Sequence, residues 1–285
     1  MFNFTTSIWS TLEQAIAEDI GSGDVTTNAL IAPDLKTKAA IIAKSDGVIA
    51  GLEVALSVFE LVDPSLESVV LVQDGSMVAP GELVGQVSGS TSSILRAERV
   101  ALNFLQRLSG IATMTSLYVQ AVAGTKARII DTRKTIPGLR ELEKYAIRVG
   151  GGFNHRFNLS DGILIKDNHI LALRESGFTI SNIIKLARDR SPHTLKVEIE
   201  VESIDEAKEA LEGGADVILL DNMTSSVMKD VVDLVNGRCI LEASGGVNLN
   251  TVADIAKTGV NLISVGALTH SVKAMDISLD IYNRL

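Results

Sequence analysis

From Ala127 onward the chain alternates short apolar segments with amphipathic helices, and this alternation limits the fold more than any other feature of the sequence. The six segments are Ala127–Asp131, Gly162–Lys166, Lys196–Glu200, Val217–Asp221, Cys239–Ala243 and Leu262–Val265. Short apolar runs separated by helices are typical of parallel strands buried on both faces. Six such units in one chain predict an α/β barrel, or an incomplete one, rather than an open doubly wound sheet.

The part of the chain before this region mixes helices with short β segments. We expect a helix near Ser7–Glu18, strands at Thr37–Ala43 and Val48–Ala50, and β segments with Gly and Pro turns over residues 73–87. A long helical pattern then runs from about Ile94 to Val122. We interpret this helix as the boundary between two domains.

The composition excludes several classes of protein. Hydrophobic residues make up 46% of the 285 positions, enough for a sizeable core, but no run approaches the ~18 apolar residues of a membrane-spanning helix. The single cysteine, Cys239, excludes an internal disulfide and fits a reducing compartment. Aromatic residues make up only 4%, which argues against base stacking on nucleic acid. We therefore expect a cytoplasmic protein with no membrane or nucleic-acid partner.

The net charge of −9 conceals a basic middle region. Between Arg96 and Arg174, 13 Lys and Arg residues stand against 6 Asp and Glu residues. An acidic protein with such a region is a candidate for binding a small polyanion. The alternative is that these cations lie on solvated helix faces, and their position relative to the strand ends decides between the two.

Charged or Gly-rich residues stand at the end of every predicted strand. In chain order they are 131–134, 166–169, Glu200, Asp221 with Asn222, 244–246, and Gly266 with Ala267, and the run GGGFNHR (150–156) lies between the first two strands. The carboxyl ends of parallel strands meet on one face of a barrel, where active sites are found. The sequence therefore predicts a site at this face.

The residue types at these strand ends indicate the ligand. Glycines at the last two strand ends let the backbone approach a phosphate closely. Glu200 and Asp221 supply oxygen ligands suited to holding Mg²⁺ against a diphosphate. The opposite side carries four cations suited to carboxylates, Arg133, Lys134, Arg156 and Lys166. We expect a ligand with a phosphate, a metal-bound diphosphate and further carboxylates.

Taken together and in this order, these motifs resemble the quinolinate phosphoribosyltransferase family. The resemblance spans nearly the whole chain, and the block from Asp131 to His169 is its most specific part. The matching runs are EDIGSGDVT (18–26), DTRKTIPGLR (131–140), EKYA (143–146), GGGFNHR (150–156), LIKDNH (164–169), LLDNM (219–223) and EASGG (242–246).

The resemblance implies the reaction, the fold and the assembly of that family. Quinolinate and phosphoribosyl pyrophosphate give nicotinate mononucleotide, pyrophosphate and CO₂, with Mg²⁺ as cofactor. The implied fold is an N-terminal α/β sandwich domain followed by an open α/β barrel, in a homodimer with shared active sites; assembly beyond the dimer stays open. We therefore predict a sandwich domain over residues 1–112, a barrel domain over 113–270, and a C-terminal helix over 271–285 that packs on the sandwich domain.

The resemblance also implies a role for each matching residue. The two quinolinate carboxylates are expected to be held by Arg133, His155, Arg156 and Lys166, and by Arg99 from a second subunit. The expected catalytic residues are Lys134 and Lys166, which face the pyrophosphate, and Glu200 and Asp221, which contact the ribose hydroxyls and Mg²⁺. The remaining expected substrate contacts are Thr132, Ser244, Gly245, Gly246, Val265, Gly266 and Ala267. The roles of His169 and Arg140 stay open.

Three other functions compete with this interpretation. A phosphoribosyltransferase acting on nicotinate would need fewer cations, because nicotinate has one carboxylate. A non-catalytic phosphate-binding barrel would need the glycines but not both Glu200 and Asp221. A Schiff-base aldolase using Lys166 predicts that borohydride traps a carbonyl substrate on that lysine.

Overall fold

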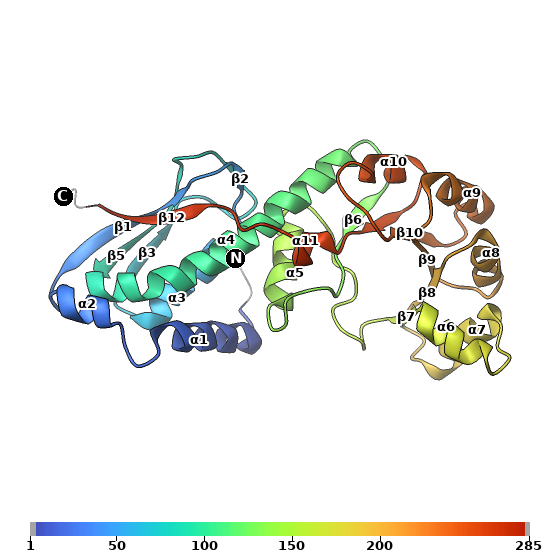
Figure 1. Cartoon of the computed structure of the whole chain (residues 1–285), viewed down its shortest axis with the longest axis horizontal. Coiled ribbons are helices and arrows are strands. Elements are labelled where there is room, and N and C mark those ends of the chain that lie inside the picture. The colour runs from blue at the N-terminus through green and yellow to red at the C-terminus, as the bar shows by residue number, and fades with distance from the viewer. Residues whose placement is uncertain (1–3, 283–285) are drawn as a thin grey trace. The chain divides into compact units, whose positions relative to one another are not determined.

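The computed structural model describes residues 4–282, which form two compact units (Figure 1). Among the described residues, the first unit consists of 4–116, Thr135–Gly151 and 271–282, and the second of Leu117–Lys134 and Gly152–His270. Residues 135–151 therefore group with the amino-terminal part of the chain, whereas the sequence analysis assigned them to the barrel domain. The reason is tertiary packing, because Glu143 is fully buried with Oε1 2.6 Å from Arg107 Nη2.

A four-stranded antiparallel sheet forms the centre of the first unit, in the order β12-β1-β5-β3. Its strands are β1 (Lys36–Ala43), β3 (Glu67–Val70), β5 (Leu83–Ser90) and β12 (Ile277–Tyr282), and a separate pair is formed by β2 (Gly47–Val48) and β4 (Met77–Val78). The helices are α1 (Thr6–Ile20), α2 (Val25–Leu30), α3 (Leu52–Val62), α5 (Arg140–Val149) and most of α4 (Thr91–Ala121). The helices expected near Ser7–Glu18 and Ile94–Val122 are therefore present.

The carboxyl-terminal segment is a strand, not the helix predicted over 271–285. β12 pairs antiparallel with β1, from Ile277 opposite Ala43 to Tyr282 opposite Lys38. Ile277 and Leu279 are buried whereas Asp280 is exposed, which is the period-two alternation of a strand with one face on a core. The prediction was wrong because a short apolar run is too brief for its periodicity to separate helix from strand. Residues 283–285 lie outside the described part of the chain.

The second unit contains a six-stranded parallel sheet in the order β6-β11-β10-β9-β8-β7, which confirms all six predicted strands. They are β6 (Arg128–Ile130), β7 (Ile163–Ile165), β8 (Val197–Val201), β9 (Val217–Asp221), β10 (Ile240–Ser244) and β11 (Leu262–Ser264). The helices are α6 (Asp167–Arg174), α7 (Ile180–Arg190), α8 (Ile204–Glu212), α9 (Ser225–Val235), α10 (Val252–Lys257) and α11 (Ala267–His270). Among the described residues β6 and β7 do not pair, so the barrel is open.

The loop before β7 runs beside the unpaired edge of β6. Phe153 forms an isolated parallel bridge with Ile130 of β6. The guanidinium of Arg128 lies 4.8 Å from the centre of the Phe153 ring, a distance that favours a cation–π contact. This loop therefore occupies the seam between the two end strands of the sheet.

α4 is amphipathic along its 31 residues. Ile94, Leu105 and Ile111 are fully buried, whereas Arg99 and Asn103 are exposed. None of the described helices combines the length and the apolar character that crossing a membrane requires. α4 is therefore a surface helix with one face on the core, and Arg99 lies on its other face.

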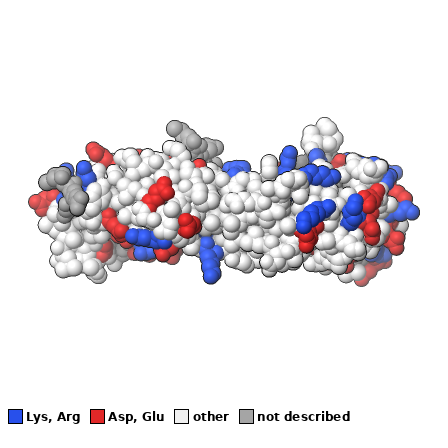
Figure 2. Space-filling view, turned by 90° about the horizontal axis from the view of Figure 1, so that it is seen from above, with Lys and Arg blue, Asp and Glu red and all other residues white. Residues whose placement is uncertain are grey.

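Charges of both signs are spread over the surface. On the face drawn in Figure 2, acidic and basic side chains are interspersed, so the net charge of −9 is not gathered into one patch there. Some cations of the basic middle region are not at the surface at all: Lys144 is 1% exposed, and Arg107 pairs with the buried Glu143. Solvated helix faces therefore do not account for the whole of that region.

A carboxylate from a distant loop fixes the start of α3. Gly51 precedes the helix at φ = 85° and has no side chain to cap it. Asp74 supplies the cap, because its Oδ2 accepts the N–H of Gly51 at 2.6 Å and its Oδ1 accepts the N–H of Leu52 at 3.1 Å. Tyr145 of α5 donates its hydroxyl to the same Oδ2 at 2.6 Å. One side chain thus links α3, α5 and the loop before β4.

We expect Asp74→Ala to lower the free energy of unfolding by about 2–4 kcal/mol, because three hydrogen bonds to one carboxylate are lost. Tyr145→Phe is the matched control, since it removes only one of the three donors, and we expect it to cost about 1 kcal/mol. Urea unfolding followed by far-ultraviolet circular dichroism measures both losses. Equal losses in the two variants would contradict the capping role of Asp74.

Candidate active site

A cavity of about 400 Å³ opens at the carboxyl ends of the parallel strands, within the second unit. The predicted site residues that line it are Thr132, Arg133, Lys134, His155, Arg156, Lys166, Glu200, Asp221, Ser244, Gly245 and Gly246. It is also lined by residues that the sequence analysis did not select, Leu164, Leu219, Asn222, Glu242 and Ser264. Strand ends that are far apart in the sequence therefore meet around one space, as a parallel barrel requires.

Four predicted residues do not line this cavity. Val265 is 1% exposed and belongs to the core. Gly266 packs closely against Lys134, because an added Cβ there would lie 3.1 Å from Lys134 Cδ. Ala267 begins the short helix α11. Arg99 belongs to the first unit, where it is exposed on α4, and its contribution to a partner's site stays a prediction.

Four cations line the cavity, and two of them, Arg133 and Arg156, repel each other. Burial lowers the pKa of Arg156, and the nearby charge of Arg133 lowers it further. Arg156 Nη1 donates to the carbonyl of Gly162 at 3.0 Å, which holds the guanidinium in place. Cations held close together in a half-buried site are stabilised by an anionic ligand. The alternative of solvated helix faces is therefore wrong for these residues.

Short hydrogen bonds fix the loops that carry these cations. The fully buried Asp131, at the end of β6, accepts the N–H of His155 at 2.8 Å and the side-chain amide of Asn154 at 2.6 Å. Lys134 N donates to Thr132 Oγ1 at 3.0 Å, and the hydroxyl of Thr269 donates to the carbonyl of Lys134 at 2.8 Å. These buried or uncharged partners therefore hold the loops in place, and the loops in turn position the charged side chains.

Glu200 and Asp221, from the neighbouring strands β8 and β9, form the acidic side of the cavity. Burial raises the pKa of Glu200, and the negative charge of Asp221 raises it further. Asn222, at φ = 53°, donates its side-chain amide to Asp221 Oδ2 at 2.7 Å. A divalent cation between two carboxylates removes their repulsion, and carboxylate oxygens are the ligands that Mg²⁺ prefers. These two residues therefore fit Mg²⁺.

The backbone of the Ser244–Gly246 loop comes unusually close to Asn222. An added Cβ on Gly245 would lie 2.2 Å from Asn222 Oδ1 and 2.8 Å from Asn222 N, and Gly245 has φ = 88°. Gly246 also has a positive φ, of 60°, but open space where a Cβ would stand. Only glycine fits position 245, whereas the constraint at position 246 is conformational alone.

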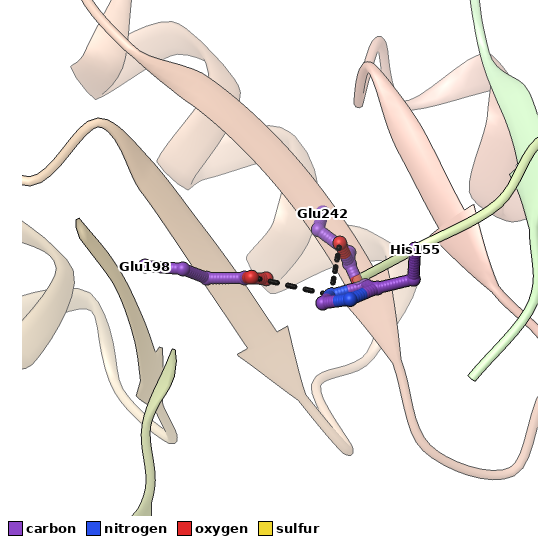
Figure 3. A group of neighbouring side chains, drawn as sticks. All are labelled: His155, Glu198 and Glu242. Carbon is purple, nitrogen blue, oxygen red and sulfur yellow. Dashed lines mark ion pairs between the residues drawn. The ribbon is translucent and has the colours of Figure 1, made fainter. Parts of the chain in front are cut away.

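Two acidic side chains that the sequence analysis missed lie deeper in the strands, next to His155 (Figure 3). His155 Nε2 lies 3.2 Å from Glu198 Oε2 and 3.7 Å from Glu242 Oε2. The two glutamates are 8% and 1% exposed. Glu198 stands two residues before Glu200, and Glu242 two residues before Ser244, so strand alternation places each pair on one face. This alternation was the signal in the sequence that pointed to them.

These three side chains bring their ligand atoms within 4.8 Å of one another, a spacing that could hold a metal ion. However, His155 Nδ1 accepts the N–H of Arg156 at 2.7 Å, so the ring proton lies on Nε2, the atom that a metal would need. Burial, followed by the charge of Glu198, raises the pKa of Glu242 well above its usual range. The protonated form of Glu242 is therefore favoured, and the three side chains form a compact triad in which Glu198 is the glutamate nearer to His155 Nε2.

The two residues whose roles the sequence left open have structural partners. His169 Nδ1 accepts the N–H of Lys166 at 2.9 Å, at the start of α6, which is a capping interaction. Arg140 Nε donates to Thr135 Oγ1 at 3.0 Å. Neither residue lines the cavity.

Two family models match this chain. The model described as quinolinate phosphoribosyl transferase, C-terminal domain, matches residues 111–280, and the N-terminal domain of the same family matches residues 24–109. A relative from Bacillus subtilis (strain 168), named probable nicotinate-nucleotide pyrophosphorylase (carboxylating), is 44% identical over 95% of this chain and 92% of its own length. A relative from Arabidopsis thaliana, named nicotinate-nucleotide pyrophosphorylase (carboxylating), chloroplastic, is 44% identical over 99% of this chain and 84% of its own length.

Solved structures share the fold over nearly the whole chain. NadC from Streptococcus pyogenes has 42% sequence identity and a TM-score of 0.93, covering 99% of this chain and 100% of that one. Human nicotinic acid phosphoribosyltransferase has 11% identity and a TM-score of 0.59, covering 98% of this chain and 75% of that one. The second likeness shows the fold alone.

We expect Gly245→Ala to destabilise the protein more than Gly246→Ala. Both variants place a Cβ in the left-handed region, at about 1–2 kcal/mol each, but only the first adds a clash with Asn222. Thermal and urea unfolding of the two variants give the comparison, and Gly246→Ala serves as the matched control. If Gly245→Ala were no less stable than its control, the close approach to Asn222 would not be a constraint.

Proposed function

The chain belongs to the quinolinate phosphoribosyltransferase family, and on that premise we propose that the cavity at the ends of the parallel strands is its active site. The protein is a quinolinate phosphoribosyltransferase (decarboxylating), an enzyme of NAD biosynthesis. It transfers the phosphoribosyl group of phosphoribosyl pyrophosphate to quinolinate, with release of pyrophosphate and CO₂. The observation that carries the assignment of the site is the meeting of four cations and a carboxylate pair around one space of about 400 Å³.

The cationic side fits quinolinate. Arg133, Arg156 and Lys166 bind its two carboxylates, since guanidinium groups match carboxylates with paired hydrogen bonds and lysine adds a point charge. The repulsion between Arg133 and Arg156 is relieved when the dianion binds. Both ring nitrogens of His155 face protein groups, so we assign His155 to holding the Arg156 loop rather than to direct contact with a carboxylate.

The acidic side fits the ribose and its diphosphate. Glu200 and Asp221 accept hydrogen bonds from the ribose hydroxyls, and their charge stabilises the positive charge that develops on the sugar when pyrophosphate leaves. The same two carboxylates would hold Mg²⁺, which would supply positive charge opposite the diphosphate. Lys134 and Lys166 face the leaving pyrophosphate, and the Ser244–Gly246 loop receives the 5′-phosphate through its backbone. The chain thus contributes mainly by orienting the substrates and by electrostatics.

The substrate supplies the chemistry of decarboxylation. Once the ring nitrogen carries the ribose it is positively charged, and it stabilises the electron pair that remains on the neighbouring carbon when CO₂ leaves. Cations around the carboxylates determine which acid can bind. Arg133, Arg156 and Lys166 exceed what the single carboxylate of nicotinate needs, and this favours quinolinate.

A homodimer with shared sites is the assembly that we propose. Arg99 is exposed on α4 of the first unit, and the residues that line the cavity all belong to the second unit. An exposed arginine on a rigid helix is suited to complete the anion site of another subunit. Assembly beyond the dimer stays open. A cytoplasmic location also stays a prediction, since plant relatives are named chloroplastic or mitochondrial.

We expect purified protein to convert quinolinate, but not nicotinate, in the presence of phosphoribosyl pyrophosphate and Mg²⁺. Arg133→Ala should lower kcat/KM for quinolinate by about 100-fold or more, because a charged hydrogen-bond partner of the carboxylate is lost. Arg174→Ala is the matched control, since Arg174 pairs with Glu206 away from the cavity. Mononucleotide and CO₂ are measured together. Product from nicotinate alone, or normal activity of Arg133→Ala, would overturn the assignment of the site.

We expect a mixture of the Arg99→Ala and Arg133→Ala proteins to regain activity that each lacks alone. Random exchange of subunits makes about half of the dimers hybrid, and each hybrid has one intact site, so about one quarter of the wild-type activity should return. Native mass spectrometry establishes that the subunits have exchanged. Exchange without any recovery would count against a site shared between subunits.

A further inference from the structure

A second cavity, of about 410 Å³, lies at the amino-terminal ends of the parallel strands, where Arg128, Ile163, Val217 and Leu262 line it. The loop before β7 forms another part of its wall and runs beside the edge of β6, so we call it the seam cavity. Its lining includes the exposed Arg128, Phe153 and Asp161, so it reaches the solvent. His155, Arg156 and Glu242 line this seam cavity and also the substrate cavity. These three residues therefore lie between the substrate cavity and a second cavity that opens to solvent.

Among these three residues, Glu242 has a buried oxygen atom, Oε1, without a hydrogen-bond partner among residues 4–282. Glu242 faces Glu198 of β8, His155 of the seam loop, Ser264 of β11 and Asp131 of β6. Burial and the charge of Glu198 raise its pKa, which favours the protonated form. A buried carboxylic acid facing a substrate cavity is the arrangement of a general acid.

The other protonated groups near the substrate are less suited to giving a proton away. His155 directs its Nε2–H at the carboxylates of Glu198 and Glu242, and its Nδ1 accepts the N–H of Arg156. Lys134 and Lys166 hold anionic groups, and giving up a proton would remove the charge that holds them. Glu242 gains a negative charge when it gives up its proton, and His155 Nε2, which lies 3.7 Å from Glu242 Oε2, is near enough to stabilise part of that charge.

The reaction requires one proton at a defined carbon. When CO₂ leaves, the C–CO₂ bond breaks and its electron pair stays on the ring carbon beside the alkylated nitrogen. The product carries hydrogen at that carbon, so a proton must arrive from a donor. We propose that Glu242 is this donor, a role that rests on the proposed function of the site: the carbon takes the carboxyl proton of Glu242, which is left as a carboxylate. Solvent in the seam cavity then returns a proton to Glu242, which balances the step.

Glu242→Gln tests the proposal in a single turnover with excess enzyme, quinolinate, phosphoribosyl pyrophosphate and Mg²⁺. Glutamine keeps the size and the hydrogen-bonding capacity of the side chain but has no acidic proton to donate. We expect pyrophosphate to form within about 3-fold of the wild-type rate. Nicotinate mononucleotide should form about 100-fold more slowly, because general acid catalysis contributes about 10²–10⁴-fold. The decarboxylation intermediate, quinolinate mononucleotide, should then be found in acid-quenched samples.

Two further variants keep the test decisive. Glu242→Asp retains a donor, and we expect it to restore part of the rate of mononucleotide formation even if the glutamine variant is unstable. Ser264→Ala changes a neighbouring residue of the same cavity without removing an acid, and pyrophosphate and mononucleotide should form together. Nicotinate mononucleotide keeping pace with pyrophosphate in Glu242→Gln would overturn the proposal. So would an equal fall in both products. If the wild-type protein released no pyrophosphate, the proposed function itself would fail instead.

Discussion

The parallel register of the six-stranded sheet decides which side chains meet in the active site. Leu219 of β9 lies opposite Glu200 of β8 on one side and Glu242 of β10 on the other. Two residues nearer the carboxyl ends of the strands, Asp221 of β9 lies opposite Ser244 of β10. Side chains alternate along each strand, so a shift of one residue in any pairing would turn an entire row away from the cavity. The pair Glu200 and Asp221, the Ser244–Gly246 loop and the triad of His155, Glu198 and Glu242 all depend on this register.

The site holds charges that are unfavourable until substrates arrive. Arg133 lowers the pKa of Arg156, and Asp221 raises that of Glu200. On each side of the cavity, a neighbour of like charge therefore disfavours the charged form of the residue. An anion bound on one side and a divalent cation on the other relieve both repulsions. Like charges are thus held close together on each side of the cavity, an arrangement in which stability is exchanged for function.

The sequence was sufficient to predict the parts of the fold that follow from local periodicity. Six apolar segments predicted six strands, and the polar residues after them predicted which residues gather in the cavity. The segment that contains β12 was predicted as a helix. The six residues of this strand include only two buried positions, which fit the two-residue period of a strand and the 3.6-residue period of a helix equally well. Residues 135–151 group with the first unit because Glu143 packs beside Arg107, a contact that sequence spacing does not reveal. Glu198 and Glu242 lie inside β8 and β10, two residues before Glu200 and Ser244, so polar residues at the strand ends alone do not indicate them, whereas strand alternation does.

Because β6 and β7 do not pair, the loop that carries His155 and Arg156 can line the cavity. In a closed barrel these strands would share hydrogen bonds, and the backbone between Phe153 and Arg156 would have no place inside. Here the bridge between Ile130 and Phe153 takes over part of that pairing, and Asp131 holds the N–H of His155. The loop can then direct His155 and Arg156 into the interior while its other side remains near solvent. The open barrel therefore brings Arg156, His155 and Glu242 to the substrate cavity and leaves beside them a second cavity that opens to solvent, as the proposed reprotonation of Glu242 requires.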